Sequence, residues 1–186
     1  MPVLALHSEI FMKRFFLLLV VIVLGKTVSF AVLPLHFEKA FLKELQNKSK
    51  LTNEVFQPLV VPEKFKLNGW YMQFKVDSKV KYGYAGKVFT HRSQANATST
   101  NEYIEYVIFF DTLFTIQKVK VISITANNGI GVSAPNWLKQ FIGFKPGSYL
   151  QVGKEIDGIS GATNTVNSFT FDIQSKTNIL KEICRN

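Results

Sequence analysis

Two runs of β-branched and aromatic residues in the second half of the chain constrain its fold more than any other feature. Residues 102–110 and 116–125 each have the length and composition of a β-strand. Only a short segment that begins with Asp111 and Thr112 separates them, and so short a connection joins neighbouring antiparallel strands. The chain is therefore predicted to build an antiparallel sheet.

Other segments extend this pattern on both sides. Strands are predicted over residues 70–76, 79–90 and 149–152, and helices over residues 36–47, 135–141 and 165–183. Gly83 and Gly86 predict a bend or bulge within the second strand, and Pro58 and Pro62 discourage regular pairing in the segment before the sheet. Residues 92–101, rich in Ser, Asn and Thr, are predicted to form a loop. The expected fold class is α+β, a twisted antiparallel sheet with packed helices.

The N-terminal part of the chain has the features of a secretory signal peptide. Lys13 and Arg14 precede the almost wholly apolar residues 15–24, and a small-x-small pattern ends at Ala31. This apolar run is shorter than the roughly 20 residues that span a bilayer. We expect a translation start at Met12, cleavage after Ala31, and a protein in the periplasm or at the outer face of the cytoplasmic membrane. An uncleaved, membrane-associated anchor is the alternative.

The remaining composition excludes several classes of function. Cys184 is the only cysteine, so an internal disulfide is impossible, and the three histidines are too scattered to predict a metal site. The sequence contains no recognisable acid–base or nucleophile–base pair. Its formal net charge is +9, but export argues against nucleic acid as the partner. Anionic lipid headgroups or an acidic redox partner fit this charge better, and solubility alone is the alternative.

The segment of residues 157–166, Asp-Gly-Ile-Ser-Gly-Ala-Thr-Asn-Thr-Val, carries the strongest functional signal. It places the hydroxyl of Thr163 after three small residues and six positions after the carboxylate of Asp157, just before a predicted helix. Small residues allow another molecule to approach the backbone closely. A helix N-terminus offers free N–H groups and the positive end of a dipole to a phosphate. The alternative is a turn that only caps the helix, with Asn164 and Thr165 as the expected capping residues.

Residues 157–163 resemble the flavinylation signature Asp-x-x-Ser/Thr-Gly-Ala-Thr of the FMN-binding domain family. This family includes subunits of sodium-translocating NADH:quinone reductases, of Rnf-type complexes and many small exported proteins. The resemblance implies that Thr163 carries FMN covalently through a phosphoester bond, which a separate flavin transferase makes from FAD. It also implies an electron carrier that is not an enzyme by itself, and a redox partner that is exported or lies in the membrane.

The resemblance assigns the cofactor-binding residues and also shows where the chain departs from the family. Thr163 is the expected acceptor, Asp157 matches the acidic position that the transferase recognises, and Ser160, Gly161 and Ala162 are expected to admit the transferase and then line the phosphate. The family's Glu-Thr-Pro-Gly-x-Gly segment corresponds to residues 127–131 here, which keep the glycines and lack Glu, Thr and Pro. Trp137, Phe141 and Tyr84 are either core residues, which their helical or strand spacing favours, or walls for the flavin ring.

The predicted organisation is a signal peptide over residues 1–31, a helix and irregular linker over residues 32–75, and an FMN-binding domain over residues 76–186. Two other functions stay open on the sequence. A non-covalent ligand-binding or scaffold domain without flavin predicts a colourless protein. An FMN-dependent reductase requires a substrate pocket beside the flavin, for which the sequence provides no signal.

Overall fold

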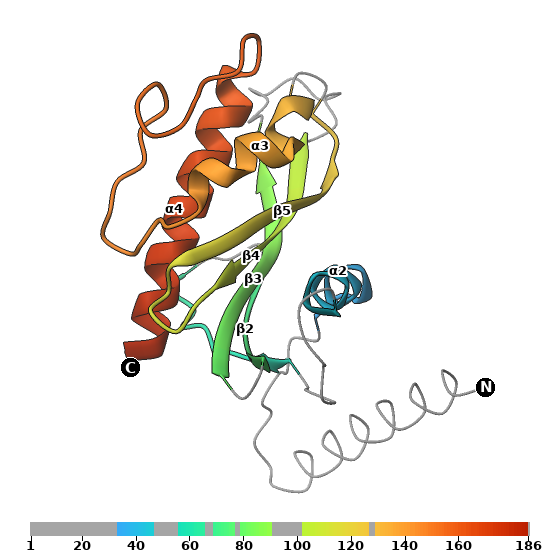
Figure 1. Cartoon of the computed structure of the whole chain (residues 1–186), viewed down its shortest axis with the longest axis vertical. Helices are drawn as coiled ribbons and strands as arrows, with labels where there is room; N and C mark the ends of the chain where they lie inside the picture. The colour runs from blue at the N-terminus through green and yellow to red at the C-terminus, as the bar shows by residue number, and fades with distance from the viewer. Residues whose placement is uncertain are drawn as a thin grey trace, which may run out of the picture. The chain divides into compact units, whose positions relative to one another are not determined.

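A five-stranded antiparallel sheet with helices on both faces organises the part of the chain that the structure, a computed structural model, describes (Figure 1). The described residues are 33–46, 56–65, 69–76, 79–90, 102–126 and 129–185. The chain separates into two units, Met1–Ala31 and Val32–Asn186, and every described residue belongs to the second. The predicted signal peptide, the loop at residues 92–101 and residues 127–128 lie outside the described residues.

The strands follow one another in the sheet in the order in which they occur in the chain. They are β1 (Gln57–Pro58), β2 (Gly69–Val76), β3 (Lys79–Phe89), β4 (Tyr103–Phe110) and β5 (Ile116–Ile124). The α-helices are α2 (Leu35–Gln46), α3 (Pro135–Leu138) and α4 (Thr163–Arg185), and the 3₁₀ helices are η1 (Ile130–Ser133) and η2 (Lys139–Phe141). The predicted α+β class and the antiparallel sheet with packed helices are confirmed.

One face of the sheet packs against α4 and the segment from η1 to η2. Alternate residues of β4, among them Tyr106 and Ile108, point into this core, as expected for a strand in which successive side chains face opposite sides. Phe169 of α4 and Phe141 of η2 are fully buried there, with ring centroids 6.0 Å apart. Helix α4 is thereby held across the sheet, and its first residues lie at one end of this core.

Helix α2 covers the other face. Its buried residues Phe37, Phe41 and Leu45 recur at helical spacing and contact the remaining alternate residues of β4, such as Val107 and Phe109. Because β4 is covered on both faces, nearly all of its side chains are buried. This explains why its sequence is an almost continuous apolar run rather than a strict alternation of apolar and polar residues.

A predicted bulge and a predicted strand are wrong. The pairing of β3 with both neighbours runs through Gly83 and Gly86 without a bulge, and the irregularities occur instead between β4 and β5. Gly83 serves packing, because a Cβ there would lie 2.7 Å from Cε1 of Phe41. Residues 149–152 form no strand and contribute only an isolated bridge between Val152 and Ile156; the N–H group of Leu150 donates instead to Oε1 of Gln174 in α4 at 2.6 Å.

The prolines before the sheet limit regular pairing as predicted, and the helix boundaries lie close to the predicted ones. Strand β1 has two residues, and Pro58 lies in it at the edge of the sheet, where a residue without an N–H group is tolerated. Helix α4 begins at Thr163, two residues before the predicted start, and the helix predicted over residues 135–141 consists of α3 followed by η2. The β-branched residues Thr163, Thr165 and Val166 do not delay the helix, because the last two are buried against the core.

Candidate functional site

Helix α4 begins at Thr163 without a side-chain cap. The N–H group of Val166 donates to the carbonyl oxygen of Ala162 at 2.9 Å, which makes Ala162 the N-cap residue. An alanine side chain cannot accept a hydrogen bond, and the first turn contains no acidic residue. Asn164 and Thr165 lie inside the first turn, so the prediction that they cap the helix is wrong. The first turn itself therefore places no negative side chain at the positive end of the helix dipole.

The three residues before Thr163 form the turn that leads into the helix. Gly161 has a φ of +74°, a conformation that L-residues with a side chain rarely adopt, and Ala162 donates its N–H group to Ile159 O at 3.0 Å. Ala162 is buried, whereas Ser160, Gly161 and Thr163 are exposed. The positive φ at position 161 thus favours a glycine, and the buried position of residue 162 favours a small apolar side chain. The hydroxyl-bearing side chain of Thr163 remains at the surface.

Asp157 is held by its backbone and leaves its carboxylate exposed. Its N–H group donates to Oε1 of Gln140 at 2.7 Å, and its carbonyl oxygen accepts from Nε1 of Trp137 at 2.9 Å. Trp137 is itself stacked on Phe169 of α4, with ring centroids 6.2 Å apart. The start of the signature is therefore fixed by α3 and η2, although about 20 residues of sequence separate them.

The altered glycine segment packs directly against the signature. A Cβ on Gly129 would lie 2.6 Å from Cγ2 of Thr165, and one on Gly131 would lie 3.1 Å from Cδ1 of Ile159. Any larger residue at Gly129 would displace the first turn of α4. Gly129 and Gly131, the glycines that this chain keeps from the family's Glu-Thr-Pro-Gly-x-Gly segment, thus allow the backbone to run close beside residues 157–165.

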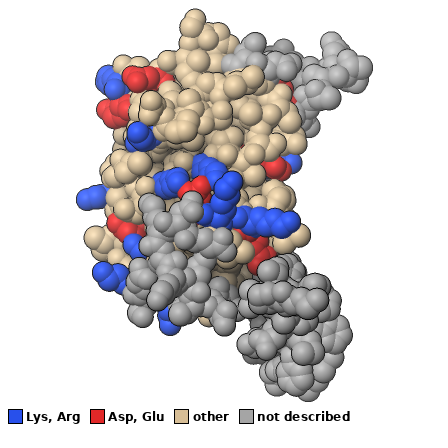
Figure 2. Space-filling view, turned by 45° about the vertical axis from the view of Figure 1, so that its right-hand side comes forward, with Lys and Arg blue, Asp and Glu red and all other residues tan. Residues whose placement is uncertain are grey.

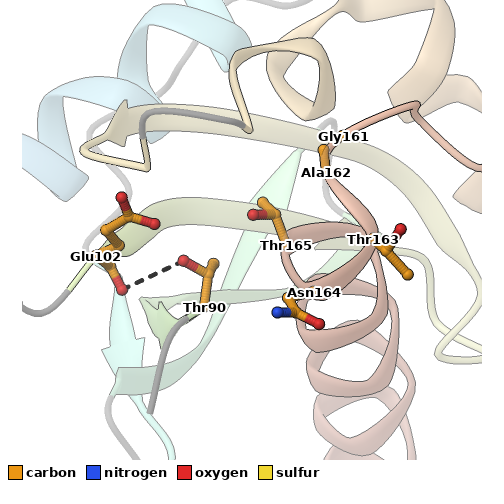
Figure 3. A pocket seen from close by; sticks show the side chains of 7 residues that line it. All are labelled: Thr90, Glu102, Gly161, Ala162, Thr163, Asn164 and Thr165. Carbon is orange, nitrogen blue, oxygen red and sulfur yellow. Dashed lines mark hydrogen bonds between the residues drawn. The ribbon is translucent and has the colours of Figure 1, made fainter. Parts of the chain in front are cut away.

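A pocket of about 230 Å³ opens at the start of α4 (Figure 3). It is lined by residues from two separate regions: Thr90 and Glu102 at the ends of β3 and β4, and Gly161, Ala162, Thr163, Asn164 and Thr165. In Figure 3, Thr165 points from the first turn toward Thr90 and Glu102, whereas Thr163 projects from the other side of this turn. Of the predicted site residues, Gly161, Ala162 and Thr163 border the pocket, and Ser160 and Asp157 do not.

Sequence reasoning missed Thr90 and Glu102. The backbone joins them, because the N–H group of Thr90 donates to the carbonyl oxygen of Glu102 at 3.0 Å. The N–H group of Thr125 likewise donates to Tyr103 O at 3.0 Å, so continuation of this register places Glu102 beside Ala126, at the start of the altered glycine segment. The sequence does contain an acidic residue, Glu102, just before β4. Its position beside the altered glycine segment, however, becomes visible only from the pairing register of β4 and β5.

The aromatic residues considered for the flavin ring belong to the core. Tyr84 and Phe141 are fully buried, and Trp137 is 9% exposed. All three belong to the cluster between the sheet and α4, which confirms the core interpretation that their spacing favoured.

The described residues contain neither a cluster of potential metal ligands nor a membrane-spanning helix. They contain no group of three or more His, Cys, Asp or Glu side chains arranged to hold a metal ion. Among the helices of the described ranges, none has the combination of length and apolar character that crossing a membrane requires.

Part of the chain matches a known protein family. Residues 100–175 match the model of the FMN-binding domain, which confirms the resemblance based on the signature. The matched segment runs from the start of β4 through β5 and α3 into α4, and so contains both Glu102 and the signature. Comparison with curated proteins and with solved structures gave no significant match. The match indicates a flavin-binding protein of the electron-transfer type.

Proposed function

We propose that this chain, which carries an FMN-binding domain over residues 100–175, holds FMN covalently on Thr163 and acts as an exported electron carrier. One observation carries the proposal. The last threonine of the signature is exposed at the first position of a helix that has no capping side chain and no acid in its first turn. The residues present fit the group, because a phosphate there meets free N–H groups and the positive end of the dipole.

The attachment is a phosphoryl transfer in which Thr163 is the acceptor. An Oγ1–P bond forms between Thr163 and the FMN part of FAD, the pyrophosphate bond of FAD breaks, AMP leaves, and the hydroxyl proton passes to the transferase or solvent. In this proposal a separate flavin transferase is the catalyst of the transfer. The exposed carboxylate of Asp157 is available for recognition by that enzyme.

After attachment, the chain holds and surrounds the cofactor, while FMN supplies the redox chemistry. The first turn of α4 faces the phosphate with its N–H groups. Gly129 and Gly131 have no Cβ and therefore allow this turn and the preceding loop to pack closely against them. The permanent bond suits an exported protein, because a flavin lost outside the cytoplasm is not readily replaced.

Export and a redox partner outside the cytoplasm are supported by the sequence of residues 1–31, with its basic start, apolar run and small-residue end. The positive net charge favours a partner with an acidic docking surface. Cell fractionation of the full chain tests this part of the proposal. A protein retained in the cytoplasm would refute it without affecting flavin attachment.

Mass spectrometry of the protein co-expressed with a flavin transferase tests the attachment. We expect one FMN moiety on the peptide that contains Thr163, complete loss of it in Thr163→Ala, and its retention in Thr163→Ser. Thr112→Ala is the matched control, because it removes an exposed threonine hydroxyl from the turn between β4 and β5. A colourless wild-type protein, or an adduct that survives Thr163→Ala, contradicts the proposal.

A further inference from the structure

The pocket beside Thr163 has two walls of different chemistry. One wall is the start of α4, with N–H groups that no intrahelical carbonyl accepts and no acidic side chain in the first turn. The other wall is formed by the carboxylate-bearing Glu102 and by Thr90. The first wall suits an anion, and the second suits a group that donates hydrogen bonds.

The second wall is built into the sheet. Thr90 follows β3 and Glu102 precedes β4, and their backbones are joined by the hydrogen bond from Thr90 N–H to Glu102 O at 3.0 Å. The hydroxyl of Thr90 donates to the same oxygen at 3.4 Å (Figure 3). Thr90 is buried and Glu102 is half-buried. The backbone position of Glu102 is therefore set by two paired strand ends and not by the signature.

FMN has the same division of chemistry as the pocket. Its phosphate is an anion, whereas its ribityl hydroxyls and its ring N–H group are hydrogen-bond donors. A carboxylate repels the phosphate and accepts from the donors, so the two walls admit the cofactor in one orientation. At about 230 Å³ the pocket is smaller than the ~300–1,000 Å³ of most sites that enclose a whole ligand, so it takes only a part of FMN.

We propose that Glu102 is a flavin-orienting residue that lies outside the attachment signature, and that it accepts hydrogen bonds from the donor-bearing part of FMN while the phosphate stays at the start of α4. This inference rests on the proposed attachment to Thr163. It also predicts an effect on the flavin potential. A negative charge close to the flavin opposes the addition of electrons, so Glu102 keeps the midpoint potential lower than a neutral side chain would.

The test compares two charge removals on the same strand region. Glu102→Gln keeps the size of the side chain and removes its charge. Glu105→Gln does the same three residues further on, where the carboxylate pairs with Lys87 at 3.2 Å and does not line the pocket. Both full-length variants are co-expressed with the flavin transferase. The measurements are the midpoint potential, the visible circular dichroism and the fluorescence anisotropy of the bound flavin.

We expect Glu102→Gln to shift the potential to a more positive value, to change the flavin circular dichroism and to lower the anisotropy, and Glu105→Gln to leave all three unchanged. Equal effects of the two variants, or no effect of Glu102→Gln, overturn the inference. Far-ultraviolet circular dichroism verifies the fold of each variant, and Thr90→Val provides a second variant in the same wall. A wild-type protein without flavin refutes the attachment and this inference with it. A flavinylated wild type that is insensitive to Glu102 refutes the inference alone.

Discussion

The two faces of the sheet differ in where they keep their polar groups. On the face covered by α2, the buried residues of the cluster are apolar, and Glu44, whose side chain is 13% exposed, pairs with the more exposed Lys118 and Lys120. Basic side chains surround an acidic one on the side of the molecule turned forward in Figure 2. On the α4 face both charged partners are largely buried: the side chain of Lys176 is 9% exposed and binds Asp172 at 2.7 Å, and Tyr106 donates to the same carboxylate.

This difference in polar contacts agrees with what each face packs against: α2 on one side and the signature-bearing helix α4 on the other. Helix α2 only has to close an apolar surface, for which its apolar stripe suffices. Helix α4 has to place the signature at a defined position relative to β3, β4 and α3. The hydrogen bond from Tyr106 to Asp172, together with the buried bond from Tyr71 to Lys176 O at 2.7 Å, forms only at one register of helix and sheet. The face that carries the signature is thus the one with directional contacts in its core.

The largest effect is expected from emptying the centre of either core. Phe41→Ala and Phe169→Ala each remove a fully buried ring and should lower the free energy of unfolding by about 3–5 kcal/mol. Of these two rings, Phe169 contacts Trp137, so Phe169→Ala and not Phe41→Ala should speed hydrogen exchange at the Asp157 amide beyond the global loss. Denaturant unfolding and hydrogen exchange measure the two effects, with Phe→Leu variants as milder substitutes. Equal local exchange in both variants would show that the faces are not separate.

Removing one charge from each face should show the difference between the two faces more clearly, as unequal losses of unfolding free energy. Asp172→Asn leaves the ammonium of Lys176, whose side chain is 9% exposed, without its counter-charge, and should cost about 3 kcal/mol in unfolding free energy. Glu44→Gln should cost less than about 1 kcal/mol, because Lys118 and Lys120 are 40% and 30% exposed and water screens them. Denaturant unfolding of both variants at neutral pH checks this. Similar losses in the two would contradict the contrast.

The pH dependence of stability should show the same contrast with smaller effects. Burial and then the charge of Asp172 raise the pKa of Tyr84 and of Tyr106 well above their ordinary value of 10.0. Their contribution is complete below pH 10.0 and is lost as the pH rises toward the folded-state pKa, because the unfolded state ionises first. Tyr106→Phe should weaken this alkaline loss.

The α2 face should respond at acid pH. Burial raises the pKa of Glu44, but the hydrogen bonds and charges of Lys118 and Lys120 outweigh it and hold the pKa below 4.5. The stability that Glu44 contributes is therefore present above pH 4.5 and is lost as the pH falls through the folded-state pKa. Thermal unfolding of wild type and Glu44→Gln between pH 3 and 7 measures this, and parallel curves would exclude the effect.

Local patterns in the sequence were sufficient for most elements. The alternation and composition of residues 70–125 predicted strands β2 to β5, and the spacing of Phe37 and Phe41 predicted α2. These predictions succeed because the period of apolar residues depends only on neighbouring positions. The prediction of a bulge at Gly83 was wrong. A glycine in a strand can mark a bulge or can allow a ring from another element to approach, and no local pattern distinguishes these two roles.

For the candidate site, the sequence by itself was sufficient to select Asp157, the small residues and Thr163 as candidates, because they lie within one short motif. Only the tertiary structure decided that Trp137 and Gln140 hold the backbone of Asp157, and that Glu102 borders the pocket. These contacts depend on strand register and on the packing of α4 across the sheet. Both arise from interactions between residues far apart in the chain, which the order of amino acids specifies only after the whole domain has folded.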